Sequence, residues 1–173
     1  MRLIRQILIG AIVLSLVLLA ISSLLPNEVM TSRWVLIDAE KDTVLKKVRD
    51  LNSWNSWILF LQTAEQVDIK KSGNQHDIGS VISWKTENGG LNRITITENN
   101  EKGIITETEL NNDRSFVSGF SVEKRKVDSV QVVWFIVEKL KWYPWEKFYG
   151  IMAGDIKGPY MQRSLERLKL SLE

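Results

Sequence analysis

The sequence has no cysteine and only one histidine, and both shortages limit the chemistry that this protein can perform. Without cysteine the chain forms no disulfide, offers no thiolate to zinc and has no thiol nucleophile. The single histidine, His76, lies among Ser, Gly, Asn and Asp in residues 71–77, which predicts a solvated loop. A nucleophile activated by a neighbouring imidazole is therefore not expected, and we predict no metal site, no cofactor and no catalytic residue.

An excess of charge of either sign is also missing. The chain of 173 residues has 23 Lys and Arg against 21 Asp and Glu, which gives a formal net charge of +2. So small an imbalance creates no strong field for a polyanion, and nucleic acid is not an expected partner.

One long segment carries no charge at all. Between Gln6 and Asn27 there is no charged residue, and Ile7 to Leu25 is almost wholly Leu, Ile, Val and Ala. As a helix this run is roughly 28 Å long, close to the ~30 Å hydrocarbon core of a bilayer. We predict that residues 1–26 form a cytoplasmic tip and a transmembrane anchor. Residues 27–173 then form a single domain, which is long enough to bury a core.

A cleaved secretory signal is the alternative interpretation of this segment. The run exceeds the roughly 7–15 apolar residues of a signal sequence, and only Ala20-Ile21-Ser22 offers a weak cleavage site. We therefore favour an uncleaved, single-pass anchor. Arg2 and Arg5 precede it, and positive charge beside a membrane helix tends to stay in the cytoplasm. The expected orientation places the N-terminus in the cytoplasm and the domain on the extracytoplasmic side.

Short alternating segments separated by turn residues dominate the centre of the chain. They predict strands over residues 30–37, 66–70, 81–85, 91–97, 104–110, 116–123 and 129–138. Connections this short favour antiparallel hairpins, because a parallel crossover needs a dozen or more residues.

Helical periodicity is predicted before and after these strands. The first helix covers residues 41–51, and a short helix or loop with Trp54 and Trp57 follows. The last helix extends from Trp145 to Glu173, and Pro159 predicts a kink or break in it near Gly158. Its apolar stripe consists of Met161, Leu165, Leu168 and Leu172.

Several short motifs recur in a characteristic order along the chain. They are Leu25-Pro26-Asn27-Glu28-Val29, the pair Trp54 and Trp57, residues 79–84, residues 142–150, and Gly158-Pro159 in the last helix. With them the chain resembles the START-like superfamily (SRPBCC, formerly grouped as polyketide cyclase/dehydrase and lipid-transport proteins), in particular its bacterial members with an N-terminal membrane helix. Where similar proteins usually have Ala-Pro before the first helix, this chain has Ala39-Glu40, which weakens that helix-start signal.

The resemblance implies a fold of the α+β class, the helix-grip fold. In it a curved antiparallel sheet of about seven strands wraps around a long C-terminal helix, and here one transmembrane helix precedes the sheet. The resemblance also implies a cavity between the sheet and the last helix, which members of the superfamily use for lipids, hormones and polyketides.

Strand alternation and this expected cavity select candidate ligand-binding side chains. They are Trp84, Phe120, Trp134, Phe148, Met152 and Tyr160. Core filling is the other role open to each of them. Trp54 and Trp57 are assigned to the cavity mouth or to an aromatic belt at the lipid interface, with packing of their loop as the alternative.

Carboxylates of the predicted sheet are candidates for acid–base chemistry. Glu107 and Glu109 alternate with Thr106 and Thr108 along one strand. Burying two unpaired carboxylates would cost several kcal/mol, so we expect these glutamates to face water.

The leading hypothesis from the sequence is a membrane-tethered protein that binds a small hydrophobic or amphipathic molecule, with lipids among the candidates. The first alternative is an enzyme of the cyclase or hydrolase type, which predicts a polar group facing the cavity. The second is a protein-interaction domain, which predicts a filled core and an exposed apolar patch with Trp54, Trp57 or Trp142. The oligomeric state stays open.

Overall fold

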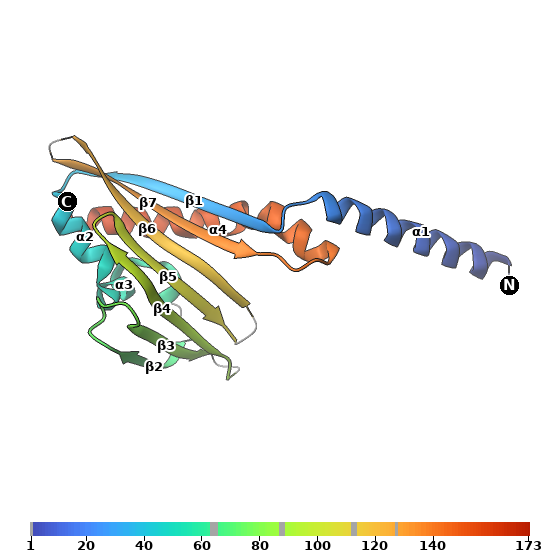
Figure 1. Ribbon diagram of the computed structural model, residues 1–173, viewed down its shortest axis with the longest axis horizontal. Coiled ribbons are helices and arrows are strands. Elements are labelled where there is room, and N and C mark those ends of the chain that lie inside the picture. The colour runs from blue at the N-terminus through green and yellow to red at the C-terminus, as the bar shows by residue number, and fades with distance from the viewer. Residues whose placement is uncertain (1, 63–65, 87–88, 112–113, 127) are drawn as a thin grey trace.

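The computed structural model describes residues 2–62, 66–86, 89–111, 114–126 and 128–173. A seven-stranded antiparallel sheet forms the centre of the molecule, and the last helix lies along one of its faces (Figure 1). The N-terminal helix projects from one end, and the C-terminus lies at the opposite end. This arrangement confirms the predicted α+β helix-grip fold. The helices are α1 (Arg2–Leu24), α2 (Lys41–Arg49), α3 (Leu51–Trp57), the 3-10 helix η1 (Leu59–Gln62) and α4 (Pro144–Leu170).

The sheet order brings the first strand next to the last. From one edge to the other the order is β1-β7-β6-β5-β4-β3-β2, and every neighbouring pair is antiparallel. The strands are β1 (Glu28–Ile37), β2 (Gln66–Ser72), β3 (Val81–Thr86), β4 (Leu91–Asn100), β5 (Gly103–Leu110), β6 (Arg114–Lys126) and β7 (Ser129–Lys139). The end of the sheet next to α1, here called the proximal end, holds the starts of β1 and β6 and the ends of β5 and β7.

Helix α1 is long and apolar enough to cross a membrane. It has 23 residues with a mean hydropathy of 2.8, and nearly all of its side chains are exposed. Its last turn packs on the start of α4, where Ser22 is 2% exposed. The segment after it is held in place, because the buried Lys147 of α4 donates hydrogen bonds to the carbonyl of Pro26 and to Asn27 Oδ1. The Leu140 amide also donates to the Asn27 carbonyl at 2.7 Å.

Buried and exposed side chains alternate along β5 and β7, and the outward position predicted for Glu107 and Glu109 is confirmed. In β7 the side chains of Val130, Val132, Trp134 and Ile136 are all buried. In β5, Thr106 and Thr108 are buried, Glu107 is exposed, and Glu109 is partly exposed beside Arg93 at 3.7 Å. Both glutamates therefore lie on the outer face, away from α4.

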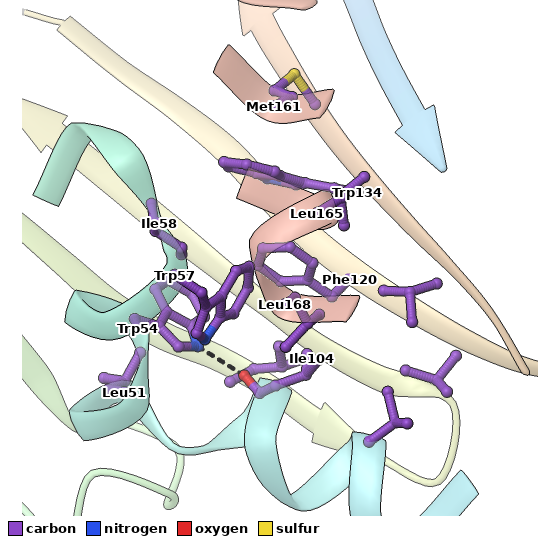
Figure 2. Close-up of a cluster of buried hydrophobic side chains, with 14 of the residues drawn as sticks. Leu51, Trp54, Trp57, Ile58, Ile104, Phe120, Trp134, Met161, Leu165 and Leu168 are labelled. Carbon is purple, nitrogen blue, oxygen red and sulfur yellow. Dashed lines mark hydrogen bonds between the residues drawn. The ribbon is translucent and has the colours of Figure 1, made fainter. Parts of the chain in front are cut away.

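Aromatic side chains fill the distal half of the core, which is the half farther from α1. Trp54 and Trp57 of α3 meet the ring of Phe120 edge to face, with centroids 5.4 and 5.3 Å away. Leu165 and Leu168 of α4 lie beside them (Figure 2). The buried indole of Trp54 donates to the Val48 carbonyl at 2.7 Å, so its polar atom is satisfied.

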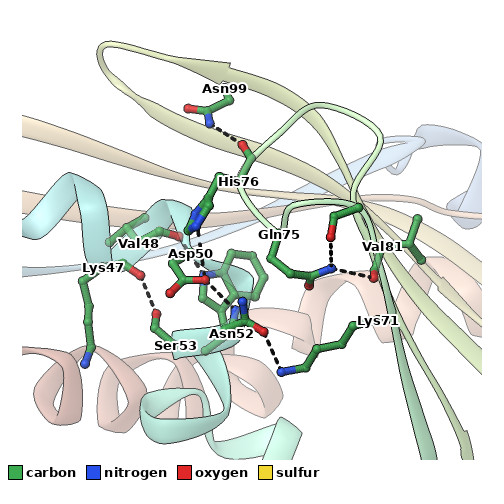
Figure 3. A network of polar contacts seen from close by, with 12 residues as sticks. Lys47, Val48, Asp50, Asn52, Ser53, Lys71, Gln75, His76, Val81 and Asn99 are labelled. Carbon is green, nitrogen blue, oxygen red and sulfur yellow. Dashed lines mark hydrogen bonds and ion pairs between the residues drawn. The ribbon is translucent and has the colours of Figure 1, made fainter.

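The junction of α2 and α3 is polar (Figure 3). Asp50 caps α3 by accepting the Asn52 amide at 2.9 Å. His76 Nδ1 lies 3.9 Å from the Asp50 carboxylate, and its side chain is 51% exposed. The predicted solvated position of this histidine is confirmed.

Of the kink or break predicted near Gly158, the break is wrong, because helix α4 continues through Pro159. Proline removes one helical hydrogen bond, but α4 is held along its length by packing against β1. Small residues let α4 lie close to Leu140 and to β1. A Cβ on Gly150 would lie 2.3 Å from Leu140 Cδ1, and one on Gly158 would lie 2.1 Å from Arg33 Nη2.

Candidate functional site

A cavity of about 260 Å³ lies between α4 and the proximal half of the sheet. Its lining residues are Phe60, Thr108, Leu110, Phe116, Trp134, Ile136, Lys157, Tyr160 and Met161. They come from η1, from the neighbouring strands β5, β6 and β7, and from α4. Most are apolar, and the volume is close to the lower end of the roughly 300–1,000 Å³ of small-molecule sites. The cavity therefore suits a small molecule, or one ring or chain of a larger amphiphile.

A polar cleft of about 150 Å³ adjoins this cavity at the proximal end of the sheet. Its lining residues are Arg114, Ser115, Glu138, Lys139, Leu140, Lys141, Glu146 and Tyr149. An ion pair joins the two spaces, because Lys157 Nζ of the cavity lies 2.5 Å from Glu138 Oε1 of the cleft. An elongated molecule could thus place an apolar part in the cavity and a polar part in the cleft.

The charged groups of this region are paired and packed on aromatic rings. Arg114 Nη2 lies 2.5 Å from Glu146 Oε1, and the Glu146 side chain is 9% exposed. Lys157 Nζ is 5.1 Å from the centre of the Phe116 ring and 5.9 Å from that of Tyr149, both within cation–π range. Such contacts let the ammonium group of Lys157 sit at the edge of an apolar space with only 23% of its side chain exposed.

The indole N–H of Trp134, a residue of the cavity wall, belongs to a buried hydrogen-bond network with Ser118 and Thr106. The Trp134 indole donates to Ser118 Oγ at 2.8 Å, and the Thr106 hydroxyl donates to the Ser118 carbonyl at 3.2 Å. Trp134 therefore turns an apolar ring surface toward the cavity while its N–H points into the sheet. A ligand against this ring would meet hydrocarbon and not a free donor.

The structure separates the six predicted cavity residues into three groups. Trp134 and Tyr160 line the cavity. Trp84 and Phe120 are 4% and 2% exposed and belong to the hydrophobic core. Phe148 and Met152 are 38% and 57% exposed. They lie on the side of α4 that faces away from the sheet.

The tryptophan pair predicted at the mouth or at the lipid interface lies in the core. Trp54 and Trp57 are 2% and 0% exposed. The exposed tryptophans near α1 are instead Trp142 and Trp145, which are 74% and 69% exposed.

Sequence reasoning missed the charged residues that border the cavity. A signal for two of them existed. Glu138 continues the inward-facing set of β7 that includes Trp134 and Ile136, and Lys157 lies one turn before Met161 on the apolar stripe of α4. Extending the period of two in β7 by one step places Glu138 at the site, and extending the helical period of α4 by one turn places Lys157 there.

The described part of the chain contains no cluster of three or more His, Asp or Glu side chains that could hold a metal ion. Groups able to exchange a proton do border the cavity. Lys157 and Tyr160 are among its lining residues, and Glu138 is bonded to Lys157. The arrangement can therefore bind an amphiphile, and it places the ammonium group of Lys157 at the edge of the cavity, whereas the Tyr160 side chain is 61% exposed.

Comparison with known families agrees with this architecture. A family profile described as "Polyketide cyclase / dehydrase and lipid transport" matches residues 29–173. Because the match covers most of the chain, the protein belongs to this family, which is part of the START-like superfamily. No curated protein matches the sequence.

Solved structures share the fold at low sequence identity. A START superfamily protein from Mycobacterium smegmatis is 18% identical with a TM-score of 0.58, over 83% of this chain and 96% of that chain. Norcoclaurine synthase from Thalictrum flavum is 12% identical with a TM-score of 0.60, over 84% and 87%. A hypothetical protein from Helicobacter pylori is 13% identical with a TM-score of 0.57, over 83% and 88%. At such identities these likenesses show the fold and not the activity.

Proposed function

We propose that the protein is a membrane-tethered binding protein that holds a small hydrophobic or amphipathic molecule beneath α4. The observation that carries this proposal is the cavity of about 260 Å³, whose wall is mostly apolar and whose edge carries the Lys157–Glu138 pair. An apolar space with few, localised polar groups is typical of ligand sites. The family description, which includes lipid transport, makes a lipid or a lipid-like molecule the first ligand class to test.

The tether in this proposal is α1. Its length and hydropathy suit a membrane span. Arg2 and Arg5 lie at its start, which favours a cytoplasmic N-terminus and an extracytoplasmic domain. The cavity favours ligand binding over a pure protein-interaction role, which would need a filled core.

The test compares two tryptophan substitutions on opposite faces of the sheet. Leu110→Trp fills part of the cavity, whereas Val117→Trp adds the same ring at a position 40% exposed on the outer face. The full-length protein is purified in a mild detergent, and bound molecules are identified by native mass spectrometry and by organic extraction. We expect a ligand that is retained by Val117→Trp and lost by Leu110→Trp. Equal occupancy of both variants, or no ligand in the wild type, contradicts the proposal.

A second candidate function is an enzyme that uses the same cavity. It is favoured by Lys157 and Tyr160 among the lining residues. Of the proteins that share the fold, norcoclaurine synthase has been solved with dopamine and hydroxybenzaldehyde, so this architecture can hold reacting molecules. Once a ligand is known, its turnover by the wild type is compared with that by Tyr160→Phe and Lys157→Met. If the wild type binds the ligand without converting it, the enzyme function is contradicted and only the binding function is supported.

A further inference from the structure

Three aromatic side chains form a cluster where α1 meets α4, and the two tryptophans among them are strongly exposed. This cluster, here called the aromatic collar, consists of Trp142, Tyr143 and Trp145. The rings of Tyr143 and Trp145 are stacked with centroids 4.4 Å apart, and Trp142 lies 6.0 Å from Tyr143. Trp142 and Trp145 are 74% and 69% exposed, although tryptophan is on average a strongly buried residue. Within the described chain, no element of the domain covers their outer faces.

The collar lies level with the end of the apolar helix. The Ser22 hydroxyl, in the last turn of α1, donates to the Trp142 carbonyl at 3.5 Å. From Arg5 to Ser22 a helix rises about 26 Å, nearly the thickness of the hydrocarbon core. If α1 crosses the bilayer, Ser22 therefore lies near the outer boundary of the hydrocarbon, and the collar lies in the headgroup layer next to it.

The collar cannot move independently of α1. Lys147, 3% exposed, donates to the Pro26 carbonyl at 2.9 Å and also bonds Asn27 Oδ1. These contacts fix the linker between α1 and β1 onto the first turns of α4. Figure 1 shows α1 and α4 both running along the long axis of the molecule.

The side chains suit a bilayer interface. Tryptophan and tyrosine have an apolar ring and a polar tip, and they are enriched where hydrocarbon meets the headgroups. A flat protein partner would also accept aromatic rings, but the packing of α4 against α1 brings a lipid surface to this site in every molecule whose α1 crosses a membrane.

We infer that the aromatic collar inserts into the headgroup layer of the membrane that α1 crosses and holds the domain upright on it. This inference rests on the proposed anchoring by α1. The collar thereby acts as a second membrane contact, and it keeps the proximal end of the sheet, with its cavity and cleft, toward the bilayer. Met152 lies seven residues beyond Trp145, about 10 Å further along the helix, which is past the headgroup layer.

The test uses the absence of native cysteine, which makes an introduced thiol unique. Trp145→Cys and Trp142→Cys place the environment-sensitive dye NBD on the collar. Trp34→Cys and Met152→Cys are matched controls, because these side chains are 56% and 57% exposed but lie away from the collar. The full-length chain is reconstituted into phosphatidylcholine–phosphatidylglycerol vesicles, with or without lipids that carry a nitroxide near the glycerol backbone.

We expect the two collar probes to emit at shorter wavelength and to lose most of their emission to the nitroxide lipids. The probes at 34 and 152 should keep the emission of a water-exposed dye. Collar probes no more quenched than the controls, in a chain that resists alkaline carbonate extraction, overturn the inference and leave the anchor intact. Oxidative disulfide cross-linking of the unlabelled collar cysteines between two copies, without lipid quenching of the labelled ones, overturns it as well. Release of the chain by carbonate refutes the anchoring by α1 and this inference together. The ligand test with Leu110→Trp does not depend on this result, because it measures binding in detergent.

Discussion

Replacing Ser118 by alanine should destabilise the domain through the indole of Trp134, a residue of the cavity wall. Ser118 and Trp134 are 6% and 3% exposed, and the indole N–H donates to the serine hydroxyl at 2.8 Å. The substitution removes one oxygen and leaves the buried N–H without its partner. An unsatisfied buried donor costs about 1–3 kcal/mol. Because Trp134 borders the cavity, a water molecule can offset part of this cost, so we expect a loss of about 1–2 kcal/mol in the free energy of unfolding.

The assay is urea unfolding of the full-length protein in detergent micelles, followed by tryptophan fluorescence and circular dichroism. The control is a double-mutant cycle with Trp134→Phe, which removes the donor and keeps an aromatic ring. In the Trp134→Phe background, Ser118→Ala should cost almost nothing, so the coupling energy is about 1 kcal/mol. If Ser118→Ala destabilises both backgrounds equally, the hydrogen bond between Trp134 and Ser118 contributes no stability and the reasoning is refuted.

Three further predictions concern two glycines and the linker. Gly154→Ala should stabilise α4 by about 0.5–1 kcal/mol, since nothing lies within 4 Å of the added Cβ. Gly103→Ala should instead destabilise by roughly 1–3 kcal/mol, since its Cβ would lie 1.8 Å from the Phe120 carbonyl oxygen; equal unfolding midpoints for the two variants would contradict both. Lys147→Met should release the linker, because it removes the donor to Pro26 and Asn27. Hydrogen exchange of the Leu140 amide and of residues 22–29 should then accelerate, and an unchanged rate would show that the linker is held by other contacts.

Much of the sheet could be predicted from the sequence because its signal is local. A strand with one face on the core shows a period of two, and every strand from β3 to β7 has that pattern with a turn cluster on either side. The burial of Thr106 and the exposure of Glu107 follow from the same rule. The family resemblance supplied the curved antiparallel sheet around a long C-terminal helix. The pairing of β1 with β7 was not predicted, because no local pattern reveals it.

The position of the tryptophans could not be read locally. Trp54 and Trp57 stand among Asn and Ser, so their segment was predicted as a short helix or loop, with both side chains at the cavity mouth or the lipid interface. They are buried because their polar atoms find partners: Trp54 bonds the Val48 carbonyl, and Trp57 Nε1 lies 3.4 Å from Ser53 Oγ. The Val48 carbonyl reaches Trp54 only once α2 and α3 fold against each other, and Ser53 faces Trp57 only once α3 is helical.

The outward position of Phe148 and Met152 has a different cause. The inward face of α4 in its first half consists of small or charged residues, including Gly150, Ala153 and Lys157. Small residues are required there because α4 approaches Leu140 and β1 closely. The large apolar residues of that half consequently fall on the opposite side, although an apolar residue on a helix is ordinarily taken to face the core.

The same distribution of side-chain size explains where the cavity forms. In the distal half, α3 contributes two indoles that meet Phe120, and Leu165 and Leu168 of α4 close the remaining space. In the proximal half α4 presents Lys157, whose ammonium turns toward Glu138, and the space beneath it is left to a cavity. No other element that the structure describes fills the space left by the small side chains of α4. Since α1 joins the domain at this same end, the structural cause of the cavity also sets its distance from α1. A ligand that approaches from the side of α1 would reach the cavity along the proximal end, without crossing the filled half of the core.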